Sequence, residues 1–217
     1  MVRSFIGGLV AGIVMFFIGF VFWGTPLSEV AFNKANDSDS AVVQNALAQG
    51  LTRTGTGTYL IPTPSTPQGT VAYGRGPIAT IHFNTGGFAA NDLSMMLPGL
   101  IFALVSGLLM SFGIAAVSRE NNFPQIARLV ILFSLGTTCW TILAQPVFNN
   151  YGWTYWVYFF VSEAVAFILA GLVIARWFVP TKRSRFAILG NQRATQYRPD
   201  FEVRQMTGSD RKWHRVG

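Results

Sequence analysis

The chain has 217 residues, of which 51% are hydrophobic and 12% are charged, and its formal net charge is +7 at pH 7. A typical soluble domain carries roughly 25% charged residues, and a disordered chain needs still more polar surface, so both classes are excluded. The mean hydropathy of +0.39 and the long charge-poor stretches predict an integral membrane protein.

Four apolar segments are long enough to cross about 30 Å of hydrocarbon as helices, which takes roughly 20 residues each. We therefore expect an all-α integral membrane protein with four transmembrane helices, a small β-containing extracytoplasmic loop domain and a basic cytoplasmic tail. The predicted helices cover Phe5 to Trp23 and, approximately, Leu97 to Val117, Leu129 to Pro146 and Tyr155 to Ala175. The chain then divides into an N-terminal transmembrane helix (1–23), the loop domain (24–96), a three-helix transmembrane region (97–178) and the tail (179–217).

The first segment follows Arg3, so it could alternatively be a cleaved secretory signal. Its apolar core is longer than the roughly 7 to 15 residues usual for such signals, and no clear small-x-small cleavage site follows Trp23. We interpret it as a retained signal anchor.

The basic residues are distributed unevenly among the segments that connect the helices. Most of them follow the fourth predicted helix, whereas residues 24–96 are slightly acidic. Since basic residues near membrane ends remain on the cytoplasmic side, both termini are predicted to be cytoplasmic and the 24–96 loop extracytoplasmic. Arginine far outnumbers lysine, which favours a GC-rich bacterial genome and hence a bacterial inner membrane.

The 24–96 loop is too long for a simple connector and too short for a large core of its own, so we expect it to fold against the helices. A short helix is predicted at residues 41–49, with Asp39 or Ser40 capping its start and Gly50 ending it. Strands are predicted at Gly57 to Ile61 and Ile78 to Phe83, the second from its alternating apolar pattern.

Proline and glycine shape the segment between these two strands. Pro62, Pro64 and Pro67 favour an extended, polyproline-like run because proline cannot donate a backbone hydrogen bond. Gly74 to Gly76 predicts a turn before the second strand.

Motifs for catalysis or cofactor binding are missing from the sequence. The glycines of TGTG and GRG lack the spacing of a nucleotide-binding loop, and Cys139 is the single cysteine. His82 has no second histidine on its side of the membrane with which to hold a metal or heme. We expect no enzymatic activity, no cofactor and no metal site.

Small residues recur along the first two predicted helices at the spacing that lets helix backbones approach closely. The first helix has Gly8 and Gly12 in GxxxG spacing. Such residues predict a helix-packing interface, either among the four helices or with a partner protein or second copy. The stripe on the second helix consists of Gly99, Ala103, Gly107, Ser111 and Ala115.

Glu163 lies inside the fourth predicted helix, where a charged carboxylate costs at least about 2.5 kcal/mol. It should face the other helices and be protonated, hydrogen-bonded or paired. Thr138 and Thr141 lie at a comparable depth on the third helix, with Gln145 nearer the outer surface, so we expect a hydrogen bond from Glu163 to this polar row. The alternatives are proton or cation handling and pairing with a partner subunit. The hydroxyls of the row can also bond to carbonyls of their own helix.

The first part of the tail carries Lys182, Arg183 and Arg185, which are predicted to contact anionic lipid headgroups or a partner protein. The sequence shows no nucleic-acid-binding fold, so nucleic acid is not an expected partner. The stripes, the loop and the tail are all contact surfaces, and they predict a non-catalytic accessory or structural subunit of a multi-subunit membrane complex, for instance a respiratory or photosynthetic one. The alternative function is a small ion or solute transporter that uses Glu163.

Overall fold

The computed structural model describes residues 2–89, 92–118 and 120–180. Within these residues, four helical segments are long and apolar enough to cross a membrane, as the sequence predicts, and the chain is a four-span membrane protein. The spans are α1 (Val2–Trp23), α4 (Met96–Ser118), the continuous run of α5 (Phe123–Thr138), η2 (Cys139–Leu143) and α6 (Ala144–Asn149), and α7 (Trp153–Val173) continued by η3 (Ile174–Phe178).

The third span begins at Phe123, earlier than the predicted start near Leu129. Asn122 caps it: its side chain accepts a hydrogen bond from the Gln125 backbone N–H (3.1 Å), and the Gln125 side chain accepts one from the Asn122 N–H (2.9 Å). This reciprocal pair satisfies two N–H groups that a helix start leaves free. The hydropathy criterion placed the start after Arg128, because a charged residue interrupts the apolar run there.

A widened π-helical turn, η2, interrupts the third span just before Pro146. Proline has no N–H to donate, and its ring excludes the carbonyl four residues earlier. In lipid no water is available to bond a freed carbonyl. The widened turn therefore lets the helix continue past a proline that is itself buried.

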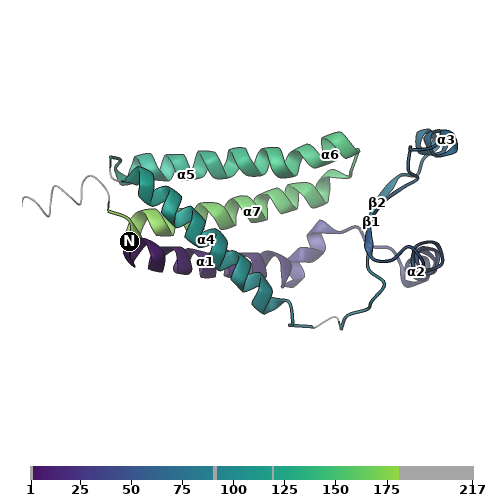
Figure 1. The fold of residues 1–217 in the computed structure, drawn as a ribbon, viewed down its shortest axis with the longest axis horizontal. Helices are drawn as coiled ribbons and strands as arrows, with labels where there is room; N and C mark the ends of the chain where they lie inside the picture. Colours follow the sequence, from purple (N-terminus) through teal and green to yellow (C-terminus); the bar gives the residue numbers. More distant parts are fainter. Residues whose placement is uncertain (1, 90–91, 119, 181–217) are drawn as a thin grey trace, which may run out of the picture.

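The four spans are arranged around α7, which packs against α1 on one side and α5 on another, while α4 packs across α1 (Figure 1). The buried core lies in the half of the bundle near the N-terminus. Toward the opposite end, which carries the 24–96 loop, α4 crosses α1 and runs away from it (Figure 1). The core residues are Ala11, Ile114, Ile126, Val130, Ala170, Ile174, Ala175 and Val179.

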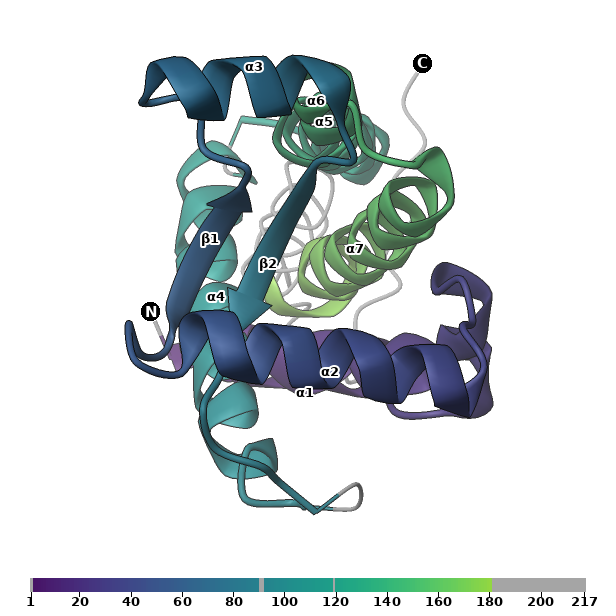
Figure 2. The same ribbon diagram turned by 90° about the vertical axis from the view of Figure 1, so that its right-hand side faces the viewer.

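The 24–96 loop contains η1 (Pro26–Ala31), α2 (Asp37–Leu51), β1 (Gly57–Ile61), α3 (Pro67–Arg75) and β2 (Ala79–Phe83). The two strands are antiparallel, with Tyr59 opposite Ile81. This confirms the small β element, with β2 starting one residue later than predicted. Figure 2 looks onto the loop and shows the strands running between α2 and α3.

The helix predicted at residues 41–49 is longer than expected. It begins at Asp37, because Asn36 accepts a hydrogen bond from the Asp39 N–H (2.8 Å), so the predicted cap at Asp39 or Ser40 is wrong. The helix also continues through Gly50 to Leu51.

The predicted polyproline-like run is wrong from Pro67 onward, where α3 begins. Thr66 accepts a hydrogen bond from the Gly69 N–H (3.0 Å), and Pro67 occupies the first turn, where its missing N–H would have had no partner in any case. Gly74 lies inside this helix, so the predicted turn is confined to Gly76, whose φ of 66° suits glycine.

The loop has almost no interior. None of the described residues from 32 to 89 is buried, and α2, α3 and the strands extend beyond the end of the spans (Figure 1). The expectation that the loop folds against the spans therefore holds for η1, which packs on α7, and not for α2 or α3.

Candidate functional site

The glycines predicted to form a helix-packing interface meet where α1 crosses α4. A Cβ atom on Gly8 would lie 2.7 Å from the Leu108 Cα, and one on Gly12 would lie 2.6 Å from the Leu104 Cα. From the α4 side, a Cβ on Gly107 would collide with the Gly8 carbonyl oxygen and lie 2.5 Å from the Gly12 nitrogen. The two backbones therefore touch at a distance that only glycine permits.

The rest of the α4 stripe divides between two environments. Ser111 is fully buried, and its hydroxyl donates a hydrogen bond to the Ser4 carbonyl of α1 (2.6 Å), while Ala115 packs half-buried against the core. Gly99 and Ala103, nearer the loop, line a pocket instead. At Gly107 and Ser111 the stripe is thus occupied by α1 and offers no surface to a partner protein.

The polar row of the third span bonds mainly to its own helix. The Thr138 hydroxyl, which is buried, donates to the Ser134 carbonyl (2.7 Å), and the exposed Thr141 hydroxyl donates to the Thr137 carbonyl (2.8 Å). The Gln145 amide donates to the Thr141 carbonyl (3.3 Å). These bonds match the expectation that such hydroxyls can be satisfied by preceding carbonyls.

Glu163 does not join that row. Over the described residues, no hydrogen bond connects its carboxylate to Thr138, Thr141 or Gln145, so the predicted bond is not formed. The carboxylate instead lines a pocket of about 410 Å³ between α1, α4 and α7. This follows from the packing of α7, which presents Glu163 to α1 and α4 and a different face to α5.

The depth of Glu163 follows from its neighbour Ser162. The Trp23 indole N–H donates a hydrogen bond to the Ser162 hydroxyl (3.2 Å), and Trp23 is the last residue of α1. The Tyr158 hydroxyl bonds to the Phe22 carbonyl at the end of α1, so Glu163 lies more than one helical turn deeper than that end, still in the half of the span nearer the loop.

Aromatic side chains around Trp23 hold the start of the loop on α7. The Trp23 ring makes edge-on or tilted contacts with Phe32, Tyr155, Tyr158 and Phe159, at centroid distances of 5.1 to 6.5 Å. The Tyr158 hydroxyl donates a hydrogen bond to the Phe22 carbonyl. Aromatic pairs of this geometry stabilise by about 0.5–1.5 kcal/mol beyond the area they bury.

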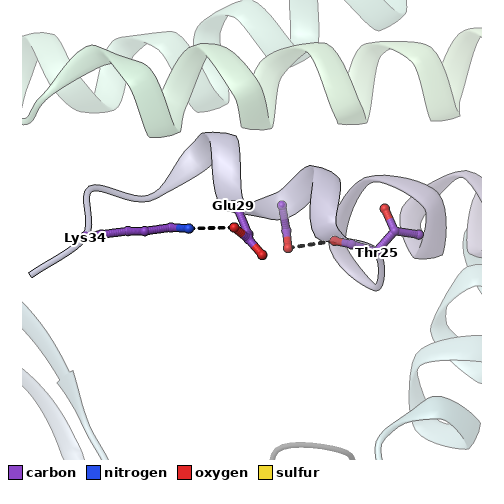
Figure 3. Close-up of polar contacts among 4 residues, drawn as sticks. Thr25, Glu29 and Lys34 are labelled. Carbon is purple, nitrogen blue, oxygen red and sulfur yellow. Dashed lines mark hydrogen bonds and ion pairs between the residues drawn. The ribbon is translucent and has the colours of Figure 1, made fainter. Parts of the chain in front are cut away.

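An ion pair lies in the segment that follows α1. The Lys34 ammonium donates to the Glu29 carboxylate (2.6 Å) (Figure 3). The Thr25 hydroxyl donates to the Val21 carbonyl of α1 (2.7 Å). The bond from Lys34 and its positive charge lower the pKa of Glu29 below its usual value. Both side chains are exposed, so this pair adds little stability.

A second cleft, of about 700 Å³, lies between the loop and the loop end of the spans. The Tyr151 ring stacks on Trp156, with centroids 5.7 Å apart, and its hydroxyl donates to the Thr80 hydroxyl of β2 (2.7 Å). His82 also lines the cleft and bonds through Nδ1 to the Thr58 hydroxyl (3.0 Å). Sequence reasoning missed this cleft because its walls come from segments far apart in the chain and form no motif.

The Tyr151 to Thr80 bond connects β2 to the spans, and its removal can be measured. We expect Tyr151→Phe to leave the bundle intact and to weaken the attachment of β2 by about 1 kcal/mol, the usual net value of such a bond. Faster amide hydrogen exchange in β2, with exchange in α7 unchanged, is the expected result. Tyr73→Phe, on α3, serves as the control. Unchanged exchange in β2 would show that the bond does not hold the strand.

The remaining predictions concern metal ligands and the basic tail. Among the described residues, no group of three or more His, Cys, Asp or Glu side chains is placed to hold a metal ion. Lys182, Arg183 and Arg185, predicted to contact lipid or a partner, lie outside the described residues.

Comparison with protein-family models, with curated proteins and with solved structures finds no match to this chain. The sequence and structure therefore define its class, a four-span membrane protein with a projecting loop, and its function has to be inferred from its own surfaces.

Proposed function

We propose that this protein is a non-catalytic accessory subunit of a larger membrane complex, and that its loop is the part that binds a partner subunit. We further propose that the loop is extracytoplasmic and the membrane a bacterial inner membrane, on the distribution and the type of the basic residues. The observation that carries the proposal is the absence of any buried residue between 32 and 89.

The helices of the loop have capping hydrogen bonds and its two strands pair with each other. Little of the apolar surface of these elements is buried by other parts of the chain. A two-stranded hairpin is marginally stable alone, and helices of fewer than about 12–15 residues are marginal in water unless they pack against something. On α2, Val42 is 68% exposed, and on α3, Val71 is 55% exposed. Because α2 and α3 lie beyond the end of the spans (Figure 1), we propose that an apolar surface of a partner subunit covers these side chains.

The test is the composition of the particle isolated from its native membrane in a mild detergent. We expect the wild-type chain to be recovered with a different protein in a fixed ratio, measured by native mass spectrometry. Val42→Glu should lose that partner while the chain itself remains folded, because a buried unpaired charge at the interface is costly.

A matched control lies on the same helix. Gln44→Glu introduces the same charge about 200° around α2, at a residue that is also exposed, and should retain the partner. Recovery of the wild-type chain as a lone monomer, or only as a homo-oligomer, would contradict the proposal, and so would equal retention of the partner by both variants.

A further inference from the structure

The pocket that holds Glu163 is lined by apolar residues of α1, α4 and α7. Its volume is about 410 Å³, within the range of pockets that bind small molecules. Glu163 is its charged residue, and the carboxylate is partly exposed to the pocket. The complete lining is Met15, Phe16, Gly19, Phe20, Trp23, Gly24, Met96, Gly99, Ala103, Glu163 and Ala166.

The pocket results from the way α4 crosses α1. The backbones touch at Gly12 and Gly107, and helices that cross at a small-residue contact diverge on either side of it. Toward the loop end the α1 backbone no longer lies against α4: a Cβ on Gly99 would meet only the Phe16 ring, at an ordinary contact distance of 3.6 Å. The space between the helices opens next to Glu163.

The protein supplies no positive charge to Glu163 within the part of the chain that the structure describes. Lys34 pairs with Glu29, and Arg3 reaches the Trp177 carbonyl at the opposite end of the bundle (3.4 Å). None of the hydrogen bonds formed by the described residues reaches the Glu163 carboxylate. A carboxylate in such surroundings needs a proton or an external cation to offset the loss of water.

The lining determines which cation fits. A metal ion such as Ca²⁺ or Mg²⁺ requires about six or more oxygen ligands, and this pocket offers one carboxylate among hydrocarbon and aromatic groups. An ammonium group requires only one anionic partner, and it is also attracted to aromatic faces such as those of Phe20 and Trp23. The methionines Met15 and Met96 can adapt to an apolar chain of variable shape.

We propose that this pocket binds the ammonium group of an amphiphilic amine, with the nitrogen beside the Glu163 carboxylate and the apolar tail between α1 and α4. The pocket extends from Glu163 to Gly24 and Met96 at the loop ends of α1 and α4, so the headgroup of a bilayer lipid such as phosphatidylethanolamine is within reach, and a free lipophilic amine has the same chemistry. The proposal is independent of the partner subunit that the loop binds.

The test counts bound amphiphiles by native mass spectrometry of the full chain in detergent. Phosphatidylethanolamine is compared with phosphatidylglycerol, and dodecylamine with dodecanol. We expect one amine-bearing molecule to be retained per chain, and roughly tenfold less retention of the partners without an amine, because a charge-assisted bond is lost. Retention of phosphatidylethanolamine alone identifies a bilayer lipid as the ligand, and retention of both amines shows that free amines also bind.

Two variants and a control assign the binding to this pocket. Glu163→Gln removes the charge at nearly constant shape, and Gly99→Leu fills the pocket while keeping the carboxylate. Each should lower retention of the amine by roughly tenfold. Glu120→Gln makes the same charge change at an exposed residue and should have no effect.

Equal retention of phosphatidylethanolamine and phosphatidylglycerol, or retention of dodecanol at the level of a bound dodecylamine, would overturn the proposal, since it would mean a protonated carboxyl that acts as a neutral group. Equal retention of the amine by the wild type and Gly99→Leu would place the amine elsewhere and would also overturn it. The Gly99→Leu result decides the matter if Glu163→Gln does not fold.

Discussion

Gly107→Ala is expected to lower the free energy of unfolding by about 2 kcal/mol, because the added methyl group has no room at the crossing of α1 and α4. Its Cβ would collide with the Gly8 carbonyl oxygen and lie 2.9 Å from the Gly12 Cα. Both neighbours are backbone, which cannot turn aside as a side chain can. The two helices would have to separate, and the bond from Ser111 to the Ser4 carbonyl would lengthen with them.

The control for this substitution lies on the same helix. A Cβ on Gly113 would meet nothing within 4 Å, so Gly113→Ala should leave stability unchanged or raise it slightly, since alanine favours a helix over glycine. Unfolding in detergent by added denaturant, followed by circular dichroism, measures both variants. Equal midpoints for the two variants would show that the crossing is looser than the structure indicates.

Trp23→Ala is expected to cost about 3 kcal/mol, the lower end of values for truncating a packed tryptophan. The substitution removes the ring at the centre of the aromatic cluster and the hydrogen bond to Ser162. Because η1 follows Trp23 directly and packs on α7, the start of the loop should also loosen. Trypsin cleavage after Lys34 should therefore become faster in this variant.

Two further substitutions separate the contribution of the Trp23 hydrogen bond from that of its ring packing. Trp23→Phe keeps a ring but loses the bond to Ser162, and should cost about 1 kcal/mol. Trp140→Ala removes a tryptophan of which 70% is exposed, and should change stability much less than Trp23→Ala. Equal effects at Trp23 and Trp140 would contradict the packing of Trp23 against α7.

Short sequence patterns at helix starts predict parts of the fold that hydropathy does not. Thr66 with Pro67 starts α3, although proline content favours an extended run there, and Asn122 with Gln125 caps α5, although hydropathy places the start of this helix later. In both, the deciding bonds span three residues and can be read from the chain. The π-helical turn before Pro146 also follows from the chemistry of proline.

The Glu163 site was predictable only in part. The cost of a carboxylate in lipid singles out this residue. Which neighbour it faces depends on how α7 is rotated about its axis. The small residues Ser162, Ala166 and Ala170 indicate a buried face of α7, but they do not say which helix covers it. The cleft at His82 and Tyr151 could not be predicted for a related reason, since it exists only where β2 meets the turn after α6.

The sequence by itself determined that four helices cross the membrane and that a two-stranded element lies between the first two, because hydrophobic length and residue alternation are local properties. Only the tertiary structure decided that α1 occupies the middle of the α4 stripe, that α4 then diverges to leave a pocket, and that Glu163 faces this pocket. The physical reason is that the lipid and the interior of the helix bundle are equally apolar. Helix pairing in a membrane therefore depends on how well two helix surfaces fit together.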